Sequence, residues 1–213
     1  CIVAQITELL TNYGEIETVW FDMGLPTEQQ SIRFRETVKS LQPSCLISGR
    51  IMNNQGDYLT LPDNGKVGGY SNLYWDNPAS MYGTWGYRSW QERPDADAQA
   101  LRQVKRLMST VSHGGVFLLN VGPDGSGKVI DYEKSVLGKI GDFVRANSEA
   151  VYNTSASPFY RLDGALCTAK GNKLFFSITD SIQTLECIGL KSNPCAAYIL
   201  DSGEKLAFET ENV

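Results

Sequence analysis

Histidine is almost absent from this chain of 213 residues, which contains His113 and no other. A metal centre built on histidine ligands is therefore excluded from this sequence, and no metal or other cofactor is expected. The cysteines are scattered and form no C-x-x-C pair, so neither a zinc ribbon nor a redox pair is indicated. The five cysteines are Cys1, Cys45, Cys167, Cys187 and Cys195. A disulfide among the last three of them is left open.

The chain also lacks an excess of positive charge and a long apolar run. Lysine and arginine number 19 against 24 acidic residues, which gives a formal net charge of −5. Nucleic-acid binding is not expected, because it calls for a basic patch or stripe. No run reaches the roughly 18 apolar residues that a membrane span needs. No secretion signal is visible, and the sequence opens within a helical pattern, so we expect it to continue a longer chain.

Helices and strands alternate over the first 150 residues. Apolar residues at helical spacing mark the opening residues and three later segments, and short apolar runs between them mark strands. This alternation predicts an α/β fold with a parallel sheet. About four β-α units are present, half of the eight in a (β/α)8 barrel. The later predicted helices are 27–41, 95–111 and 131–147; the predicted strands are 16–21, 45–48, 73–75 and 116–121.

After residue 150 the pattern changes to short segments of period two. Gly-Asn and Ser-Gly turns separate them, which is typical of a small antiparallel β domain. The predicted strands of this part are 166–168, 173–179, 185–188, 197–200 and 206–209.

Asp22 is the most informative residue of the chain. It ends the apolar strand 16–21, directly after an aromatic pair, and Gly-Pro punctuation follows. Burying a carboxylate costs several kcal/mol unless a partner offsets the loss of water. In an α/β barrel, the C-terminal ends of the strands carry the chemistry. Asp22 is therefore a candidate catalytic residue, with capping of the following turn as the alternative.

A second acid and a cation should lie near Asp22. Asp63 and Asp76 each follow a candidate strand or loop of the same face, although each also suits the start of a turn. Arg50 follows the next strand along the chain. A strand-end arginine suits either a carboxylate partner or substrate hydroxyls, while a surface ion pair is the plain alternative.

Aromatic residues gather in the two long loops 52–72 and 77–94 and beside them. Sugar-binding sites use aromatic faces against C–H groups, and these residues lie among Gly, Asn and Ser rather than among apolar neighbours. We therefore interpret them as a binding surface, with an aromatic core as the alternative. They are Tyr70, Tyr74, Trp75, Tyr82, Trp85, Tyr87 and Trp90.

Five ordered segments together resemble the α-L-fucosidases of glycoside hydrolase family 29. The first contains Trp20-Phe21-Asp22, the second is Gly-Asp-Tyr, and the fourth contains Leu-Leu-Asn-Val-Gly-Pro. The last resembles the join to the C-terminal β domain of that family. The segments are 11–22, 56–58, 83–87, 112–123 and 140–152.

The resemblance implies a retaining glycosidase with Asp22 as its nucleophile. Retention uses two carboxyl groups roughly 5–5.5 Å apart, one attacking the sugar and the other exchanging protons. Trp20, Met23 and Trp85 match positions that line the sugar pocket, and Arg50 suits an ionised Asp22. The second carboxyl group, which acts as the acid/base, completes the set of candidate site residues.

The acid/base position departs from the family pattern. The family usually has Glu there, in a Trp-Glu or Thr-Pro-Glu context, whereas this chain has Trp75-Asp76 and Leu61-Pro62-Asp63. Aspartate is one methylene shorter, and misplacement by about 1 Å can cost on the order of a hundredfold in rate. Both Asp76 and Asp63 are therefore candidates for the acid/base.

The sequence thus predicts the C-terminal half of a (β/α)8 TIM-like barrel over residues 1–150 and a small antiparallel β-sandwich domain over 151–213. The predicted function is retaining hydrolysis of terminal α-L-fucose from glycoconjugates. The alternatives are a catalytically impaired, lectin-like fucose-binding homologue and a related α-L-glycosidase. The expected partners are a fucosylated glycan and the missing N-terminal half of the barrel, and the expected location is secreted or periplasmic.

Overall fold

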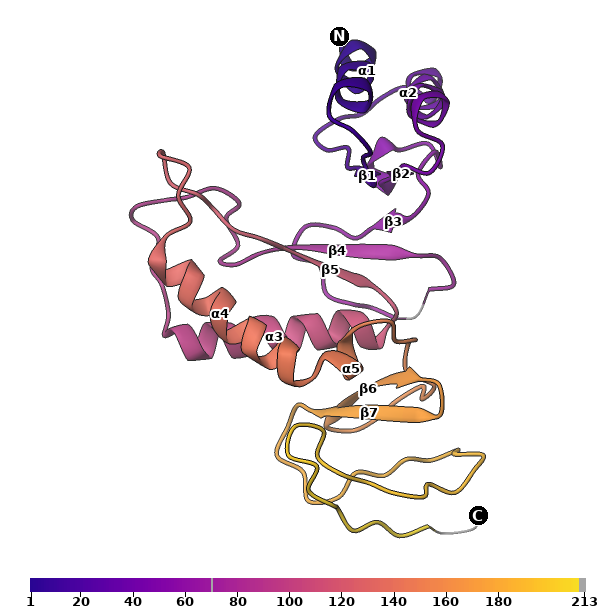
Figure 1. Cartoon of the computed structure of the whole chain (residues 1–213), viewed down its shortest axis with the longest axis vertical. Helices are drawn as coiled ribbons and strands as arrows, with labels where there is room; N and C mark the ends of the chain where they lie inside the picture. The colour runs from indigo at the N-terminus through magenta and orange to yellow at the C-terminus, as the bar shows by residue number, and fades with distance from the viewer. Residues whose placement is uncertain (70, 211–213) are drawn as a thin grey trace. The chain divides into compact units, whose positions relative to one another are not determined.

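The computed structural model describes residues 1–69 and 71–210 and divides into two compact units (Figure 1). The first unit comprises residues 1–65 and 71–78, and the rest of the described chain forms the second. The boundary predicted between 150 and 151 stays a prediction. Tyr70, one of the aromatic residues noted above, lies outside the described residues.

Two helices cover the first unit, α1 (Ile2–Asn12) and α2 (Glu28–Leu41). The start of α2 is fixed by a capping box: the Thr27 side chain accepts a hydrogen bond from the backbone N–H of Gln30, and the Gln30 side chain accepts one from the N–H of Thr27. These bonds satisfy donors that a helix start leaves without partners. The predicted helix 27–41 is confirmed to within one residue.

The first two strands of this unit are short and parallel. β1 (Thr18–Val19) pairs with β2 (Leu46–Ile47), and a 3-10 turn, η1 (Gly49–Ile51), follows β2. The sequence predicted both strands but made them longer. The apolar core lies between these strands and the two helices. Its buried members are Ile6, Leu10, Phe34, Val38, Cys45, Ile47 and Ile51.

A second parallel pair, β3 (Leu59–Thr60) with β4 (Trp75–Ser80), was not predicted correctly. The sequence prediction placed β3 in a loop and ended β4 at residue 75. All six residues of β4 are buried, yet it contains Asp-Asn-Pro, which favours turns locally. Pairing with β3 overrides that preference, and Pro78 contributes only its carbonyl, which accepts from the N–H of Asn64 at 2.9 Å.

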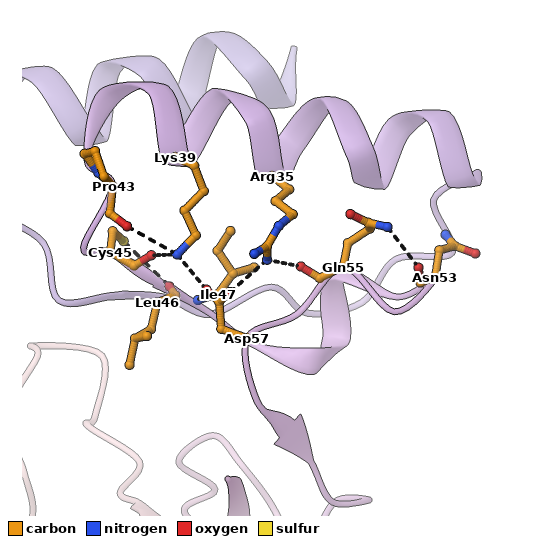
Figure 2. A network of polar contacts seen from close by, with 9 residues as sticks. All are labelled: Arg35, Lys39, Pro43, Cys45, Leu46, Ile47, Asn53, Gln55 and Asp57. Atoms are coloured by element: carbon orange, nitrogen blue, oxygen red, sulfur yellow. Dashed lines mark hydrogen bonds and ion pairs between the residues drawn. The ribbon is translucent and has the colours of Figure 1, made fainter. Parts of the chain in front are cut away.

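An ion cluster centred on Asp57 joins α2 to β2 (Figure 2). The carboxylate forms ion pairs with Arg35 Nη1 and Lys39 Nζ, each at 2.8 Å, and accepts the backbone N–H of Ile47 at 3.0 Å. The backbone N–H of Asp57 also donates to the carbonyl of Ile47 at 2.8 Å. Asp57 thus holds the last residue of β2 through both its side chain and its backbone.

The two cations of the cluster also bind backbone oxygens. Arg35 donates to the carbonyl of Gln55 at 2.6 Å, and Lys39 donates to the carbonyl of Cys45 at 2.7 Å. Burial by itself would raise the pKa of Asp57, but the hydrogen bonds and charges of Lys39 and Arg35 outweigh it and lower that pKa. The cluster therefore fastens the two chain segments that flank it to α2.

The second unit contains α3 (Ala96–Ser112), β5 (Val116–Asn120), α4 (Asp131–Ala146) and the short α5 (Ser148–Val151). α3 and α4 lie side by side (Figure 1). Asp95 caps α3 by accepting the backbone N–H groups of the second and third residues beyond it. The helices and the strand predicted for this region are confirmed within about two residues at their ends.

The C-terminal part contains one antiparallel hairpin, β6 (Ala165–Lys170) with β7 (Lys173–Ile178). The sequence predicted both strands. The strands predicted at 185–188, 197–200 and 206–209 are wrong, since one isolated bridge, between Tyr198 and Lys205, is what forms there. None of residues 181–210 is buried, so the alternating pattern has no packed face to hold a sheet.

All five cysteines lie within the described part of the chain and are free thiols. Across residues 1–69 and 71–210, no helix combines the length and the apolar character that crossing a bilayer requires. In the same residues, no three His, Cys, Asp or Glu side chains gather in a way that could hold a metal ion.

The Asp57 cluster predicts a specific dependence of stability on pH. Because the folded pKa of Asp57 is lowered, its stabilisation is present above the unfolded value of about 3.9 and is lost as pH falls through the folded pKa. Asp57→Asn should cost about 2 kcal/mol near pH 7 and flatten unfolding free energy against pH between about pH 5 and pH 2. Urea denaturation at each pH measures this.

The matched control is Asp142→Asn, which removes an exposed ion pair with Arg145. It should leave the curve close to that of the wild type, because exposed pairs contribute little. Parallel curves for Asp57→Asn and the wild type would contradict the prediction.

Candidate active site

Asp22 lies three residues beyond β1, with 47% of its side chain exposed. The chain leading to it is fixed by Ser48, which is fully buried. The N–H of Phe21 donates to Ser48 Oγ at 2.9 Å, and the N–H of Ser48 donates to the carbonyl of Val19 at 3.2 Å. Sequence analysis missed Ser48, because its contact with Phe21 spans 27 residues of chain and leaves no local signal.

Arg50 joins two of the predicted acids. From η1, its Nη1 reaches Asp22 Oδ1 at 2.8 Å, while its Nη2 binds Asp63 Oδ1 and donates to the carbonyl of Leu61 at 3.2 Å. Burial by itself would lower the pKa of Arg50, but its hydrogen bonds to Asp63 and Asp22 and their charges outweigh burial and raise that pKa. Since a guanidinium is a rigid plane, Asp22 and Asp63 are held as neighbours.

Trp20 connects this pair to the third acid. The Arg50 guanidinium carbon lies 4.7 Å from the centroid of the Trp20 ring, within the range of a cation–π contact. The indole Nε1 of Trp20 donates to Asp76 Oδ2 at 2.8 Å. The structure therefore brings together five predicted site residues: Trp20, Asp22, Arg50, Asp63 and Asp76.

The β3–β4 pair explains how Asp63 and Asp76 come close to each other in the fold. Asp76 is the register partner of Thr60, and its carbonyl accepts the N–H of Leu61 at 3.0 Å. Asp63 follows Leu61 by two residues, and the N–H of the next residue, Asn64, donates to the carbonyl of Pro78 in β4. Both acids thus project from chain segments that the pairing fixes.

The two acids differ in environment. Asp76 is 7% exposed, and its Oδ1 has no hydrogen-bond partner among the described residues. Asp63 has 47% of its side chain exposed and is paired with Arg50. Beside them, burial and the negative charges of Asp76 and Asp57 raise the pKa of Tyr58 to about 12, so that its phenol stays neutral. Sequence analysis singled out Tyr58 only as part of a motif.

The other two predicted pocket residues are Met23 and Trp85. Met23 is 95% exposed and adopts a left-handed backbone conformation, with φ at 55°, which non-glycine residues seldom adopt. Trp85 belongs to the second unit, where its carbonyl accepts from the side chain of Asn120 at 2.7 Å. The roles of Met23 and Trp85 in binding sugar stay predictions.

The arrangement suits reactions that use a pair of carboxyl groups. Asp22 is half-exposed and is oriented by its ion pair with Arg50, and an accessible carboxylate can act as a nucleophile. Two further carboxyl groups adjoin the same Arg50–Trp20 stack. A second carboxyl close to the first is the feature that retaining glycosidases share.

The chain also matches known proteins in sequence. The model of the alpha-L-fucosidase family matches residues 1–149. An alpha-L-fucosidase of Dictyostelium discoideum is 27% identical over 164 residues, which make up 72% of this chain and 35% of that protein. The plasma alpha-L-fucosidase of Homo sapiens is 29% identical over 167 residues, 70% of this chain and 34% of that protein.

A solved structure shares the fold. Alpha-L-fucosidase isoenzyme 1 from Paenibacillus thiaminolyticus superposes with a TM-score of 0.89 at 28% identity, covering 99% of this chain and 54% of that one. The chain therefore spans about a third of the length of the curated relatives and about half of this solved chain.

Proposed function

The chain belongs to the α-L-fucosidase family, and we propose that it supplies the nucleophile and the acid/base of a retaining α-L-fucosidase. The observation that carries this proposal is the pairing of half-exposed Asp22 with Arg50, next to two other carboxyl groups. The substrate is a terminal α-L-fucose on a glycoconjugate.

In the first step, a carboxylate oxygen of Asp22 attacks the anomeric carbon of fucose and the bond to the leaving oxygen breaks. The leaving oxygen takes a proton from the acid/base. In the second step, the same acid/base removes a proton from water, the water oxygen attacks the anomeric carbon, and Asp22 is released. Arg50 orients Asp22 and offsets its negative charge before attack.

We propose Asp76 as the acid/base and Asp63 as its rival. A general acid must deliver a proton, and the Asp76 carboxyl accepts a hydrogen bond from the neutral N–H of Trp20. Asp63 is instead paired with the Arg50 guanidinium, so its carboxyl is already engaged with that side chain. In this assignment, Asp63 holds Arg50 in place through Nη2, while Nη1 of the same guanidinium binds Asp22.

Further parts of the proposal concern the whole protein. Trp20, Met23 and Trp85 line the fucose pocket. The remaining strands of a (β/α)8 barrel close the sheet, and residues 151–213 form a β-sandwich domain. From the family resemblance, we also propose a secreted or periplasmic location.

A fucose-binding homologue without catalysis is the second candidate function. The observation that favours it is aspartate at both positions where the family usually carries glutamate. Aryl fucosides with good leaving groups separate the two functions, because they need little help from an acid. Their turnover supports the enzyme, and binding of fucose without any turnover supports the binding module. A related α-L-glycosidase would prefer the aryl glycoside of another sugar.

Asp22→Asn should abolish nearly all turnover of an aryl fucoside while leaving sugar binding and the fold largely intact. Asn keeps the shape of the side chain but cannot form the glycosyl ester. Azide should partly restore turnover to Asp22→Gly, since it can attack from the vacated space. Asp142→Asn is the matched control and should keep the wild-type rate. A rate above about a tenth of wild type in Asp22→Asn would refute the assignment.

Asp76→Asn should slow the hydrolysis of fucosides with poor leaving groups by about a thousandfold, and that of fucosides with good leaving groups by less than about tenfold. Asn keeps an oxygen that can accept the indole N–H of Trp20, so a change in position is minimised. Asp63→Asn should affect both classes of substrate alike. The ratio of kcat/KM across a series of aryl fucosides measures this. The opposite pattern would transfer the acid/base role to Asp63, and equal effects in both variants would exclude both residues.

Residues 1–213 expressed alone should aggregate or self-associate. Leu46 and Leu59 are strand residues that are 43% and 46% exposed, and an open sheet presents unpaired edges to other chains. Sedimentation and hydrogen exchange test this. A monodisperse monomer with strongly protected amides in β1 and β5 would contradict the half-barrel proposal.

A further inference from the structure

We propose that Asp57 is a positioning residue for Arg50, and thereby for Asp22. Among the described residues, Asp57 forms no hydrogen bond or ion pair with Arg50 or Asp22. It acts through the backbone of β2 and of η1, the turn that carries Arg50. This inference rests on the proposed function, because the position of Arg50 matters to catalysis only if Asp22 is the nucleophile.

The first step is the double connection between Asp57 and Ile47. The carboxylate of Asp57 accepts the N–H of Ile47, and the N–H of Asp57 donates to the carbonyl of Ile47. The same carboxylate is held from the other side by Arg35 and Lys39 of α2 (Figure 2). The end of β2 is therefore fixed against a helix.

The second step is the close backbone contact between Gly49, which follows Ile47, and Gly56, which precedes Asp57. A Cβ on Gly56 would lie 2.7 Å from the Cα of Gly49, and a Cβ on Gly49 would lie 2.8 Å from the carbonyl oxygen of Tyr58. The backbone of η1 thus lies directly against residues 56–58, the segment that contains Asp57. A shift of Asp57 is passed to η1 because no side chain separates the two backbones.

The third step is the position of the Arg50 side chain, which extends from η1. Its side chain reaches Asp22 at 2.8 Å and lies 4.7 Å from the Trp20 ring. A displacement of η1 by about 1 Å would lengthen the first contact beyond a hydrogen bond, and misplacements of that size cost on the order of a hundredfold in rate. An ion cluster with a purely structural role would stabilise the fold without this effect.

The test uses Asp57→Asn, which keeps the shape of the side chain and removes its charge. The reporter is the indole N–H signal of Trp20 in a tryptophan-labelled NMR spectrum, one of four tryptophan signals from this chain and assigned with Trp20→Phe. Asp142→Asn is the matched control at an exposed ion pair. All variants are compared in the complete protein under conditions where each is folded.

The expected result is a shifted or split Trp20 signal in Asp57→Asn and a fall in kcat of about tenfold to a hundredfold, with KM changing less. Asp142→Asn should change neither. Lys39→Met removes one of the two cations and should shift the same signal by less, which keeps the proposal testable if Asp57→Asn does not fold.

A Trp20 signal and a kcat per folded molecule that both match wild type in Asp57→Asn would overturn the proposal, even if the melting temperature falls. If the wild type turns over no fucoside, the proposed function fails, and the Trp20 signal alone decides whether Asp57 positions Arg50.

Discussion

The guanidinium of Arg50 is the contact on which the candidate site depends. Two carboxylates brought together without a cation would repel each other. Arg50 removes that conflict for Asp22 and Asp63 with a single rigid group. The stack on Trp20 then ties the third acid, Asp76, to the same centre, so one side chain coordinates the geometry of the others.

The charged side chains of the candidate site must be held in fixed positions, and two sets of contacts in the first unit do this. One is the apolar core between the helices and β1–β2. The other is the set of ion pairs and backbone hydrogen bonds around Asp57. Asp57 begins the short segment 57–63, and Asp63 of the candidate site ends it. Asp76 shows the cost of this design, because its buried Oδ1 has no hydrogen-bond partner within the described part of the chain, which is unfavourable.

Local features could be predicted from the sequence, and contacts between distant segments could not. The helix α2 was predictable because Thr27 and the apolar spacing after it act within a few residues. Asp22 and Arg50 were predictable as strand-end residues of neighbouring segments. The strand β4 was not, because Asp76 and Pro78 favour a turn locally and only pairing with β3 makes them a strand. Ser48 was missed for the same reason, since its role depends on a partner far along the chain.

The close approach of Gly49 and Gly56 also constrains how this chain can change over generations. Neither glycine has a left-handed backbone conformation, so the requirement at both positions is for space and not for an unusual φ. A Cβ on Gly56 would collide with the backbone of Gly49, and a Cβ on Gly49 would collide with the carbonyl oxygen of Tyr58. Both collisions are with backbone atoms, which a smaller side chain elsewhere cannot relieve, so both positions should remain glycine while the surrounding loop diverges.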